Sequence, residues 1–405
     1  MVKRDLYLDK IRPFIDKPFI KVITGIRRCG KSTILMMIKE EILDKGIDDS
    51  NIVYINFESM LYSDIDNSKK LYSYVKDQVK NSNKYYLFFD EIQEVKDWEK
   101  SINSFLIDFD CDIYITGSNS KLLSSELATY LTGRYIEINV NTLSFGEYLD
   151  FREQVNHIED INTREELKRF IRLGGFPAVH TGNYDIESAY KIVSDIYSSA
   201  LLRDTIQRYK IRNIELLERI VKFVFDNVGN TFSANNIAKY FKSQQRNVDI
   251  NTIYNYLNAL EASFIIQKVS RYDIAGKNIL KTNEKFYLAD QSLKYATMGY
   301  KDRAISGILE NIVYLELKSR GYDIFIGKLG DTEVDFIAEK QNEKVYIQVS
   351  YVLVDESTIE REFRPLLKIK DHYPKYVVTM DDFFEDNIDG VKHVNLADFL
   401  LMEKF

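Results

Sequence analysis

Residues 25–33 read G-I-R-R-C-G-K-S-T, with two glycines separated by four residues and the second followed by Lys31 and Ser32. This is the spacing of a phosphate-binding loop, the Walker A motif. Gly25 and Gly30 permit backbone angles that a side chain would block, so the loop amides can point at phosphate oxygens. In such a loop the lysine reaches the β- and γ-phosphates and the serine ligates Mg²⁺. The candidate nucleotide-binding residues are Gly25, Ile26, Arg27, Arg28, Cys29, Gly30, Lys31, Ser32 and Thr33.

The segments on either side of this loop are those that the motif requires. Residues 20–24 form an apolar, β-branched run that is typical of a buried strand, and apolar residues recur at helical spacing from Ile34 to Ile42. A helix that begins at Lys31 would direct its N-terminal amides at phosphate oxygens. An ordinary glycine-rich turn could share the spacing, but the strand–loop–helix context favours nucleotide binding.

A pair of carboxylates follows another buried strand. Residues 85–91 read Y-Y-L-F-F-D-E, which places Asp90 and Glu91 at the end of an apolar run. Mg²⁺ prefers oxygen ligands, so Asp90 is a candidate metal ligand together with Ser32. Glu91 is the candidate residue that orients and deprotonates the attacking water. A strand followed by a polar turn would look the same in isolation, but behind a phosphate loop we interpret the pair as catalytic.

Asn119 follows the next strand pattern, residues 111–118. It could bond the γ-phosphate or the water as a sensor, or it could cap the helix expected over 121–131. Strands that alternate with helices predict a parallel sheet with helices on both faces, in which ligands bind at the carboxyl ends of the strands. The loop, Asp90 and Asn119 all fall at those ends. We therefore predict an α/β P-loop nucleotide-hydrolase domain over residues 1–150.

Residues 151–290 read as a helical lid followed by a winged helix. Amphipathic helical patterns run from residue 165 to residue 228. Two shorter helical patterns, a polar turn between them and two strands then follow in the order of a winged helix. The second of these helices could enter a DNA major groove, but it carries few cations, and a packing module is the alternative. The polar residues that it offers are Asn247, Asn251, Thr252 and Asn255.

Residues 291–405 show the order helix, three strands, helix, strand, which is typical of restriction-endonuclease-like folds. In that fold a Glu on the helix, an Asp, and an Asp/Glu/Gln-x-Lys pair hold Mg²⁺ and activate water. Glu310, Asp335 and Gln348 match these positions. Strand alternation would allow the polar side chains to converge on one face of the sheet.

Ser350 stands where the nuclease pattern has its lysine. Without that cation, nothing obvious lowers the pKa of the water or stabilises the charge that develops on the phosphate. Lys344 or Arg361 could be a substitute. Two interpretations stay open: a metal-dependent nuclease site with a substituted cation, and a degenerate site that only binds.

The composition limits the classes of partner. The chain of 405 residues is 45% hydrophobic and 29% charged, which indicates a globular protein of two or three domains. Apolar runs fall short of the roughly 20 residues of a membrane span, so we expect no membrane partner. With two cysteines and no signal-peptide core, a cytoplasmic location fits. The net charge of −7 argues against uniform coating of nucleic acid, although a local basic face is compatible with it.

The motifs together resemble a family of bacterial and archaeal AAA-type ATPases that carry a C-terminal nuclease-like domain of unknown function. The resemblance covers essentially the whole chain, and it implies ATP and Mg²⁺ as cofactors, slow hydrolysis and a role on DNA. Ser350 is a departure from the active nucleases. The matching stretches are GIRRCGKS at Gly25, LFFDEIQ at Leu87, TGSNS at Thr116, LTGRY at Leu131, LSFGEY at Leu143, GGFP at Gly174, EVDFI at Glu333 and QVSY at Gln348.

Two further roles follow from likeness to AAA+ and to signalling (STAND) ATPases. Arg134 precedes the last expected strand, a place that often carries an arginine finger. If it acts in trans, the protein must form a homo-oligomer; a surface salt bridge is the alternative. Pro177 of the G-G-F-P stretch would pack near the nucleotide base, as in the GxP element of STAND ATPases, unless the stretch is only a helix-stopping turn.

These observations predict Mg²⁺-dependent ATP binding and hydrolysis that drive a conformational switch acting on DNA. In this interpretation, turnover moves the lid and winged helix relative to the nuclease-like domain. Two alternatives stay open: an ATP-gated, metal-dependent DNA nuclease, and a STAND-like signalling ATPase that binds only protein. Cleavage of DNA in Mg²⁺ or Mn²⁺ would support the first, and salt-dependent retention of DNA would separate the second from the other two interpretations.

Overall fold

The computed structural model describes residues 2–405 except 120–130, 132, 159, 300–304 and 383–386. By its internal contacts the chain divides into two compact units. The first comprises Met1–Asn141 and Ala262–Phe264, and the second comprises Thr142–Glu261 and Ile265–Phe405. The lid, winged-helix and nuclease-like segments that the sequence pattern separates at residue 290 therefore belong to one unit.

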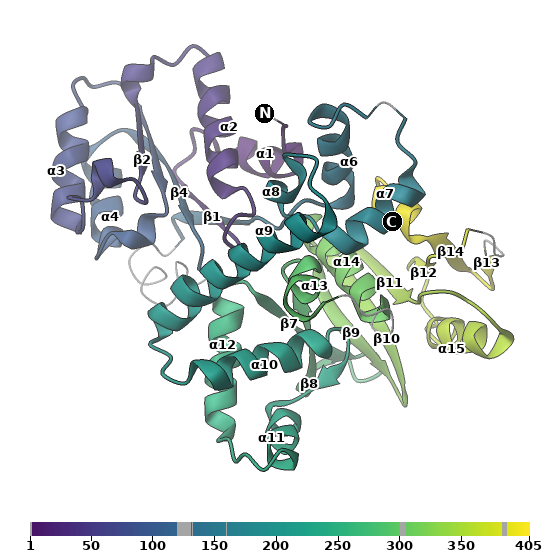
Figure 1. The fold of residues 1–405 in the computed structure, drawn as a ribbon. Helices are drawn as coiled ribbons and strands as arrows, with labels where there is room; N and C mark the ends of the chain where they lie inside the picture. Colours follow the sequence, from purple (N-terminus) through teal and green to yellow (C-terminus); the bar gives the residue numbers. More distant parts are fainter. Residues whose placement is uncertain (1, 120–130, 132, 159, 300–304, 383–386) are drawn as a thin grey trace. The chain divides into compact units, whose positions relative to one another are not determined.

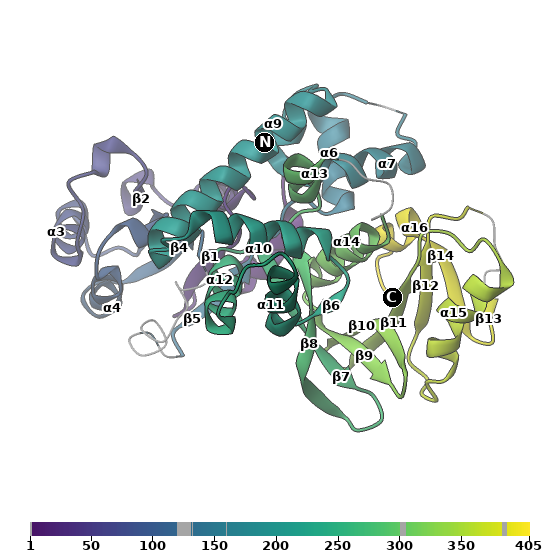
Figure 2. The same cartoon turned by 60° about the horizontal axis from the view of Figure 1, so that its bottom comes forward.

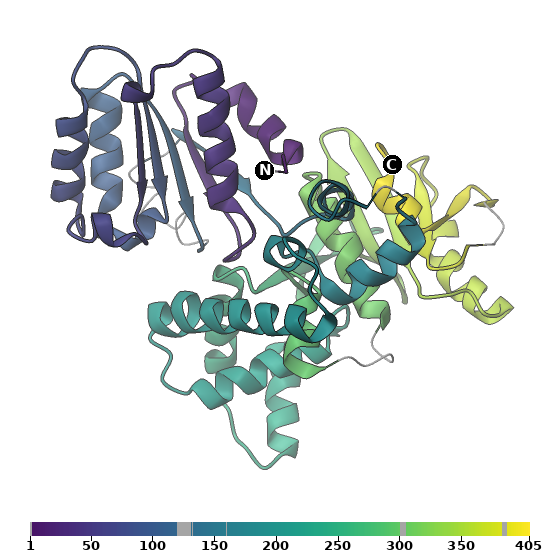
Figure 3. The same ribbon diagram turned by 45° about the horizontal axis from the view of Figure 1, so that its top comes forward.

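The first unit contains a parallel sheet, whose order among the described residues is β2-β3-β4-β1-β5 (Figure 1). Figure 3 shows α3 and α4 on one face of this sheet and α1 and α2 on the other. This arrangement confirms the predicted P-loop layer structure. The bounds are α1 Asp5–Ile11, β1 Ile20–Thr24, α2 Lys31–Asp44, β2 Ile52–Asn56, α3 Ser68–Gln78, β3 Tyr85–Asp90, α4 Trp98–Asp108, β4 Cys111–Gly117 and β5 Tyr135–Asn139.

The core of this unit holds the central strands in place. Every residue of β1 and β3 is buried, because helices cover both faces of the sheet. Phe89 of β3 stacks on Phe105 of α4 with ring centroids 5.9 Å apart. The packed strands bring their carboxyl ends to one edge, since all the pairings in this sheet are parallel. The helix expected over 121–131 lies outside the described residues except for Leu131.

The second unit begins with helices. Ser144 caps α6 and forms a reciprocal capping box with Glu147. Helix α9 continues directly into a π-helix over Ala200–Gln207. The helices are α6 Phe145–Gln154, α7 Thr163–Leu173, α8 Pro177–His180, α9 Ile186–Ser199, α10 Ile214–Asp226, α11 Ala234–Ser243, α12 Ile250–Ala262, α13 Ser292–Met298, α14 Ile305–Ser319, α15 Glu356–Leu367 and α16 Leu396–Leu401.

A mixed sheet runs through the second unit. Its order among the described residues is β13-β14-β12-β11-β10-β9-β7-β8-β6, and Figure 2 shows its strands side by side. The bounds are β6 Thr231–Phe232, β7 Ile266–Asp273, β8 Asn278–Leu288, β9 Asp323–Leu329, β10 Thr332–Lys340, β11 Glu343–Val349, β12 Lys375–Thr379, β13 Asn387–Ile388 and β14 Val391–Asn395.

The β7–β8 hairpin belongs to this sheet as well as following α11 and α12. Strand β7 pairs in parallel with β9, with Arg271 opposite Ile326. The two strands expected to close a winged helix are thus continuous with the strands of the expected nuclease-like domain. A movement of one against the other would break these backbone hydrogen bonds. Motion of the lid and winged helix relative to the nuclease-like segment stays a prediction, and it would have to leave this pairing intact.

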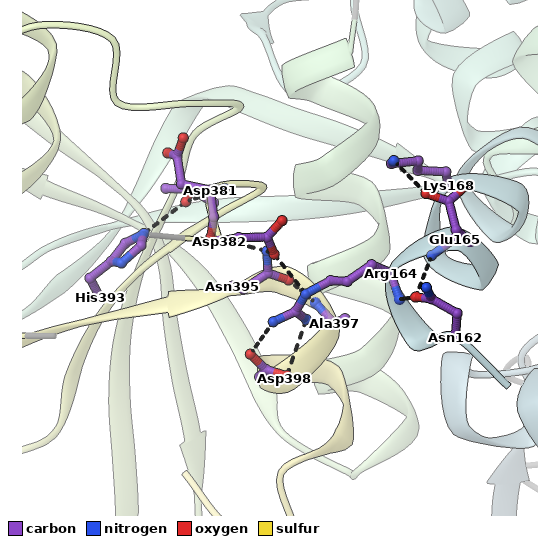
Figure 4. A network of polar contacts seen from close by, with 11 residues as sticks. Asn162, Arg164, Glu165, Lys168, Asp381, Asp382, His393, Asn395, Ala397 and Asp398 are labelled. Carbon is purple, nitrogen blue, oxygen red and sulfur yellow. Dashed lines mark hydrogen bonds and ion pairs between the residues drawn. The ribbon is translucent and has the colours of Figure 1, made fainter. Parts of the chain in front are cut away.

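Side-chain contacts also join the first helices of this unit to its C-terminal end. Arg164 of α7 binds two carboxylates, Asp382 at 2.8 Å and Asp398 at 2.6 Å (Figure 4). Asn395 donates to Asp382 at 3.3 Å, so the two contacts belong to one network. The network ties α7 to the segment around β14 and α16. Among the described residues, no helix has the length and apolar character needed to cross a membrane.

Candidate nucleotide-binding site

The glycines of the phosphate-binding loop adopt conformations that favour glycine. Gly25 has φ +148°, and a Cβ built on it would lie 2.2 Å from the carbonyl oxygen of Val140. Gly30 has φ +104° and is the N-cap of α2. A side chain at Gly25 would force the loop away from β5, and one at Gly30 would be strained. The loop therefore turns from β1 into α2 as the spacing predicts.

Lys31 is folded back into the loop that it begins. Its side chain is buried, and its Nζ donates to the carbonyl oxygens of Gly25 at 3.1 Å and Ile26 at 3.3 Å. The same nitrogen lies 3.5 Å from Oε1 of Glu91. A buried ammonium held by carbonyl oxygens and one carboxylate can transfer its contacts to a phosphate that enters the loop.

Asp90 ends β3 and is fully buried among hydrogen-bond donors. Thr116 Oγ1 donates to it at 2.5 Å and Asn56 Nδ2 at 3.0 Å, and Ser32 and Tyr54 also contact it. Burial raises the pKa of this carboxyl, although the hydrogen bonds from Thr116 and Ser32 oppose the shift. The predicted metal ligands Ser32 and Asp90 therefore meet in the structure.

Glu91 follows directly and turns out of the strand. Its φ of +54° is left-handed, and its N–H donates to Thr116 Oγ1 at 2.9 Å. Gln93 Nε2 donates to its carboxylate. Burial alone would raise the pKa of Glu91, but the charge of Lys31 and the bond from Gln93 outweigh it and lower the pKa. The carboxylate is therefore ionised and able to accept a proton at neutral pH.

Arg4, for which the sequence predicts no role, donates hydrogen bonds that hold the phosphate loop. Arg4 is 2% exposed, and its guanidinium donates to the carbonyl oxygens of Cys29 at 2.7 Å and Asn141 at 3.1 Å. The Cys29 side chain is buried, and that burial raises the pKa of its thiol. A buried thiol with a raised pKa is a packing residue and a poor nucleophile.

Of the remaining loop residues, Arg27, Arg28 and Thr33 are partly or fully exposed. Arg27 forms an ion pair with Glu58. Arg28 has φ +66° and an exposed side chain, as has Thr33 in the first turn of α2. Ile26 is buried. These four residues contribute their backbone to the loop, and of their side chains Arg27 adds positive charge that lowers the pKa of Glu91.

Asn119 lies two residues beyond the end of β4 and is fully buried. Strand β4 is the neighbour of both β3 and β1. Its carboxyl end is therefore at the same edge as Glu91 and the loop, where a sensor residue is expected. A sensor role for Asn119 stays a prediction.

Arg134 lies at the end of the sheet where the strands begin, opposite to the end that carries the phosphate loop. It immediately precedes β5, which runs parallel to β1 with Tyr135 opposite Ile20. The phosphate loop follows the other end of β1, about five residues or roughly 16 Å away along the strand. Arg134 Nη1 bonds Asn103 Oδ1 at 3.3 Å on the exposed surface. This position does not support a role on the nucleotide of the same subunit, so a finger would have to act in trans.

Pro177 begins the short helix α8 at its first position, where proline is well tolerated. The preceding turn is tightly packed within the second unit. A Cβ on Gly175 would lie 2.3 Å from the carbonyl oxygen of Leu143, and the Gly175 N–H donates to Asp290 at 2.7 Å. The G-G-F-P stretch thus has a clear packing role. Contact of Pro177 with a nucleotide base stays a prediction.

Glu310, Asp335 and Gln348 do converge, as predicted from their positions in the sequence. They line a pocket of about 360 Å³ in the second unit. We call it the acidic pocket and define it by its lining residues Glu310, Glu333, Asp335, Gln348, Ser350 and Glu362. Lys285 of β8 lies against its carboxylates, with its Nζ within 3.3 Å of Glu310, Glu333 and Asp335. Lys344 pairs with Glu339, whereas Arg361 lines the pocket and pairs with Glu362.

Several residues of these two sites were not predicted from the sequence, among them Thr116, Asn56, Arg4 and Lys285. Thr116 bridges Asp90 and Glu91, and Asn56 holds Asp90 from β2. Both lie at or next to the carboxyl end of a strand that neighbours β3. Polar residues at the ends of neighbouring strands could therefore have predicted their contact with Asp90. Arg4 and Lys285 gave no such signal, because each reaches its site from a segment distant in sequence.

Comparison with known proteins agrees with this organisation. Residues 17–149 match the AAA domain family, and residues 164–304 match a domain of unknown function, DUF8612. The Walker-type ATPase PABY2304 of Pyrococcus abyssi shares the fold, with a TM-score of 0.50 and 15% identity over 73% of this chain and 96% of that one. The first unit is thus an AAA-type ATPase domain.

Two relatives resemble the chain along nearly all of its length. An uncharacterised protein of Haemophilus influenzae is 37% identical over 407 residues, covering 99% of both chains. An uncharacterised protein of Methanocaldococcus jannaschii is 32% identical over 394 residues, covering 93% of this chain and 86% of its own. The chain therefore belongs to the same protein family as these two relatives. Its own N-terminal part is an AAA-type ATPase domain.

Proposed function

We propose that the protein binds ATP with Mg²⁺ at the edge of the first sheet and hydrolyses it, and that this turnover changes its hold on DNA. The observation that carries the ATPase mechanism is the buried contact between Lys31 and Glu91 beside Asp90. It unites a phosphate-binding cation with an ionised carboxylate that can activate water.

The residues present fit Mg²⁺ and a triphosphate. Ser32 and Asp90 are in contact and offer oxygen atoms, which Mg²⁺ prefers. Asp90 is buried, and the four contacts described for it come from neutral donors, so a cation beside it would relieve the cost of burying the charge. When bound, the ion would neutralise charge that develops on the phosphates. Ser32 and Asp90 would hold it, and the loop amides would hold the phosphates.

Glu91 would act as the general base. Its carboxylate is ionised and is oriented by Gln93 and by the Glu91 N–H bond to Thr116. With a triphosphate in the loop, Lys31 would turn from this carboxylate to the phosphate oxygens. The loss of that ion pair would make Glu91 more basic when substrate is bound, because the neighbouring positive charge holds its pKa down.

The proposed DNA contact lies on α11 and α12. Together with the β7–β8 hairpin they follow the order of a winged helix. Asn247, Asn251 and Asn255 are exposed on or just before the second helix, with Lys242 and Arg246 exposed nearby. Amide side chains can bond base edges, and the cations can contact phosphates.

ATPase rates measured with and without single- and double-stranded DNA test the proposal. We expect stimulation by one of them, and retention of that DNA that weakens steeply as salt is raised. The double variant Asn251→Ala/Asn255→Ala should lose the stimulation and keep the basal rate. Asn235→Ala, at an exposed position at the start of α11, is the matched control. Basal ATPase activity without DNA stimulation or retention would contradict the DNA part and favour a signalling ATPase that recognises protein.

A further inference from the structure

A cation that belongs to the chain itself pairs with carboxylates of the acidic pocket. Lys285 of β8 is almost fully buried, with 3% of its side chain exposed. Its Nζ lies 2.9 Å from Glu333 Oε1, 3.1 Å from Glu310 Oε2 and 3.3 Å from Asp335 Oδ1. One ammonium group therefore joins carboxylates of α14 and β10, two of which match the metal ligands of a nuclease.

Several other polar atoms of the pocket bond protein groups. Tyr287 OH donates to the same Glu310 oxygen at 3.1 Å, and the Val349 N–H donates to Asp335 Oδ2 at 2.9 Å. Gln348 accepts from the Asp335 N–H at 3.3 Å and donates to Glu362 at 3.0 Å. The two carboxylates and the amide that a metal would need are thus already engaged.

The charges of this group are mutually dependent. Burial raises the pKa values of Asp335 and Glu310, since a buried carboxylate without a cation is costly. Burial would lower the pKa of Lys285, but the surrounding carboxylates outweigh it and raise the pKa, so the ammonium stays charged. Removing the lysine would leave three carboxyl groups close together without the cation that all of them share.

These residues do not fit the metal ion of an active nuclease. Mg²⁺ requires oxygen ligands at about 2.0–2.1 Å, whereas an ammonium group already lies between the oxygens that would supply them. Among the described residues, no group of three or more His, Cys, Asp or Glu side chains is arranged to hold a metal.

We infer that the ammonium of Lys285 has taken the place of the divalent ion, and that the acidic pocket is a metal-independent ionic clasp. The clasp fixes the β7–β8 hairpin to α14 and β10, beside the backbone pairing of β7 with β9. Metal-dependent cleavage is therefore not an activity of this pocket. The hairpin and the C-terminal strands act as one body, and force from the hairpin passes directly into the C-terminal part of the sheet.

Mn²⁺ binding to the full-length chain tests the inference. Asp90→Asn is placed in every protein, so that the site in the first unit does not contribute. In this background we expect the melting temperature to be insensitive to Mn²⁺. Lys285→Met, which keeps most of the stem and removes the charge, should melt at a lower temperature and recover part of the loss with Mn²⁺, because the ion can enter the vacated pocket.

The matched control is Lys344→Met, which removes an ion-paired lysine from the neighbouring strand β11. It should melt close to the parent and show no response to Mn²⁺. Adding Asp335→Asn to Lys285→Met should abolish the Mn²⁺ response. Failure of this response in a folded Lys285→Met chain would overturn the inference.

A second measurement needs no variant at Lys285, and so stands even if Lys285→Met does not fold. Crystals of the Asp90→Asn protein soaked in Mn²⁺ should show no anomalous peak between Glu310 and Asp335. An ion found there, with Lys285 displaced, would show that the pocket remains a metal site and would overturn the inference. Either result is independent of ATP hydrolysis, which is measured separately in the protein without Asp90→Asn.

Discussion

The Nζ atom of Lys31 lies 3.5 Å from Oε1 of Glu91, so the lysine of the phosphate loop and the carboxylate after β3 form a buried ion pair. The pair joins two motifs that are 60 residues apart in the sequence. It holds the pKa of Glu91 down, even though burial alone would raise it. An entering triphosphate would compete with Glu91 for the same ammonium group, which would couple substrate binding to the basicity of the carboxylate that we propose as general base.

Replacing Lys31 with Ala should abolish ATP binding. The variant loses a charged hydrogen-bond donor to the phosphates and leaves Glu91 buried without its cation, so affinity should fall at least tenfold. Fluorescent-nucleotide titration measures the effect. Lys45→Ala, an exposed residue just beyond α2, should bind ATP as the parent does. Unchanged affinity in the Lys31 variant would remove the mechanism.

Glu91→Gln should separate binding from chemistry. The amide has nearly the shape of the carboxylate but cannot accept the proton of the water, so ATP should still bind while kcat falls by roughly 10²–10⁴-fold. Equilibrium binding and phosphate release, measured on the same preparation, give the two quantities. A kcat within a few fold of the parent would exclude Glu91 as the base.

Arg4→Met should weaken nucleotide binding without touching the nucleotide site. The variant loses the bonds from the guanidinium to the carbonyl oxygens of Cys29 and Asn141, each worth about 1.5–3 kcal/mol when a charged donor is involved. We expect a lower melting temperature that ATP partly restores, and a raised KM with a smaller change in kcat. Lys10→Met, at a partly exposed position of helix α1, which Arg4 precedes as N-cap, is the control. Parental stability and KM together would show that the loop does not depend on Arg4.

Arg134→Ala tests whether a neighbouring subunit completes the site. A finger in trans requires assembly, so the specific ATPase rate of the parent should rise with protein concentration. The variant should lose this rise. Mixtures with Lys31→Ala are diagnostic, because Arg134→Ala subunits that keep a working site should regain activity when Lys31→Ala subunits supply the arginine. A rate independent of concentration, with no gain on mixing, would leave Arg134 as a surface residue bonded to Asn103.

His180 should make the second unit less stable in mild acid. Its ring is buried and bonded to the Gly174 carbonyl oxygen at 2.8 Å, and burial lowers its pKa from 6.5 to about 4. Between those values the unfolded chain binds a proton that the folded chain excludes, so stability falls as the pH drops. The ring should contribute a loss of about 2 kcal/mol between pH 7 and pH 5.

Urea unfolding of the parent and of His180→Gln at both pH values measures this loss. The Gln variant keeps an amide donor but cannot gain a proton, so its stability should change less with pH. His372→Gln, an exposed residue of the same unit, should follow the parent. Equal pH dependence in the parent and His180→Gln would contradict the assignment.

The nucleotide site was largely predictable because each of its parts is encoded locally. The glycine spacing around Lys31 depends on backbone angles within one turn, and the position of Asp90 follows from an apolar strand that ends in a carboxylate. Parallel pairing then brings these strand ends to one edge. The same pairing places Asn56 and Thr116 beside Asp90, since they lie at the carboxyl ends of the neighbouring strands.

The acidic pocket shows the limit of such reasoning. The pattern of the C-terminal strands predicts that Glu310, Asp335 and Gln348 can converge, and all three line one pocket together with Ser350. The substitutes predicted for the lysine, Lys344 and Arg361, lie in the same segment of the sequence. The lysine that pairs with Glu310 and Asp335 is Lys285, which stands 50 residues before Asp335 in a hairpin assigned to another domain.

The sequence by itself determined the phosphate loop, the carboxylates after β3 and the order of the elements, because spacing and hydrophobic period act over short stretches of chain. Only the tertiary structure decided that Arg4 donates to the Cys29 carbonyl oxygen and that Lys285 pairs with three carboxylates of the acidic pocket. Each of these depends on which distant strands pair and in which direction. Alternating side chains specify that a strand forms, but the choice of its neighbours comes from packing of the whole unit.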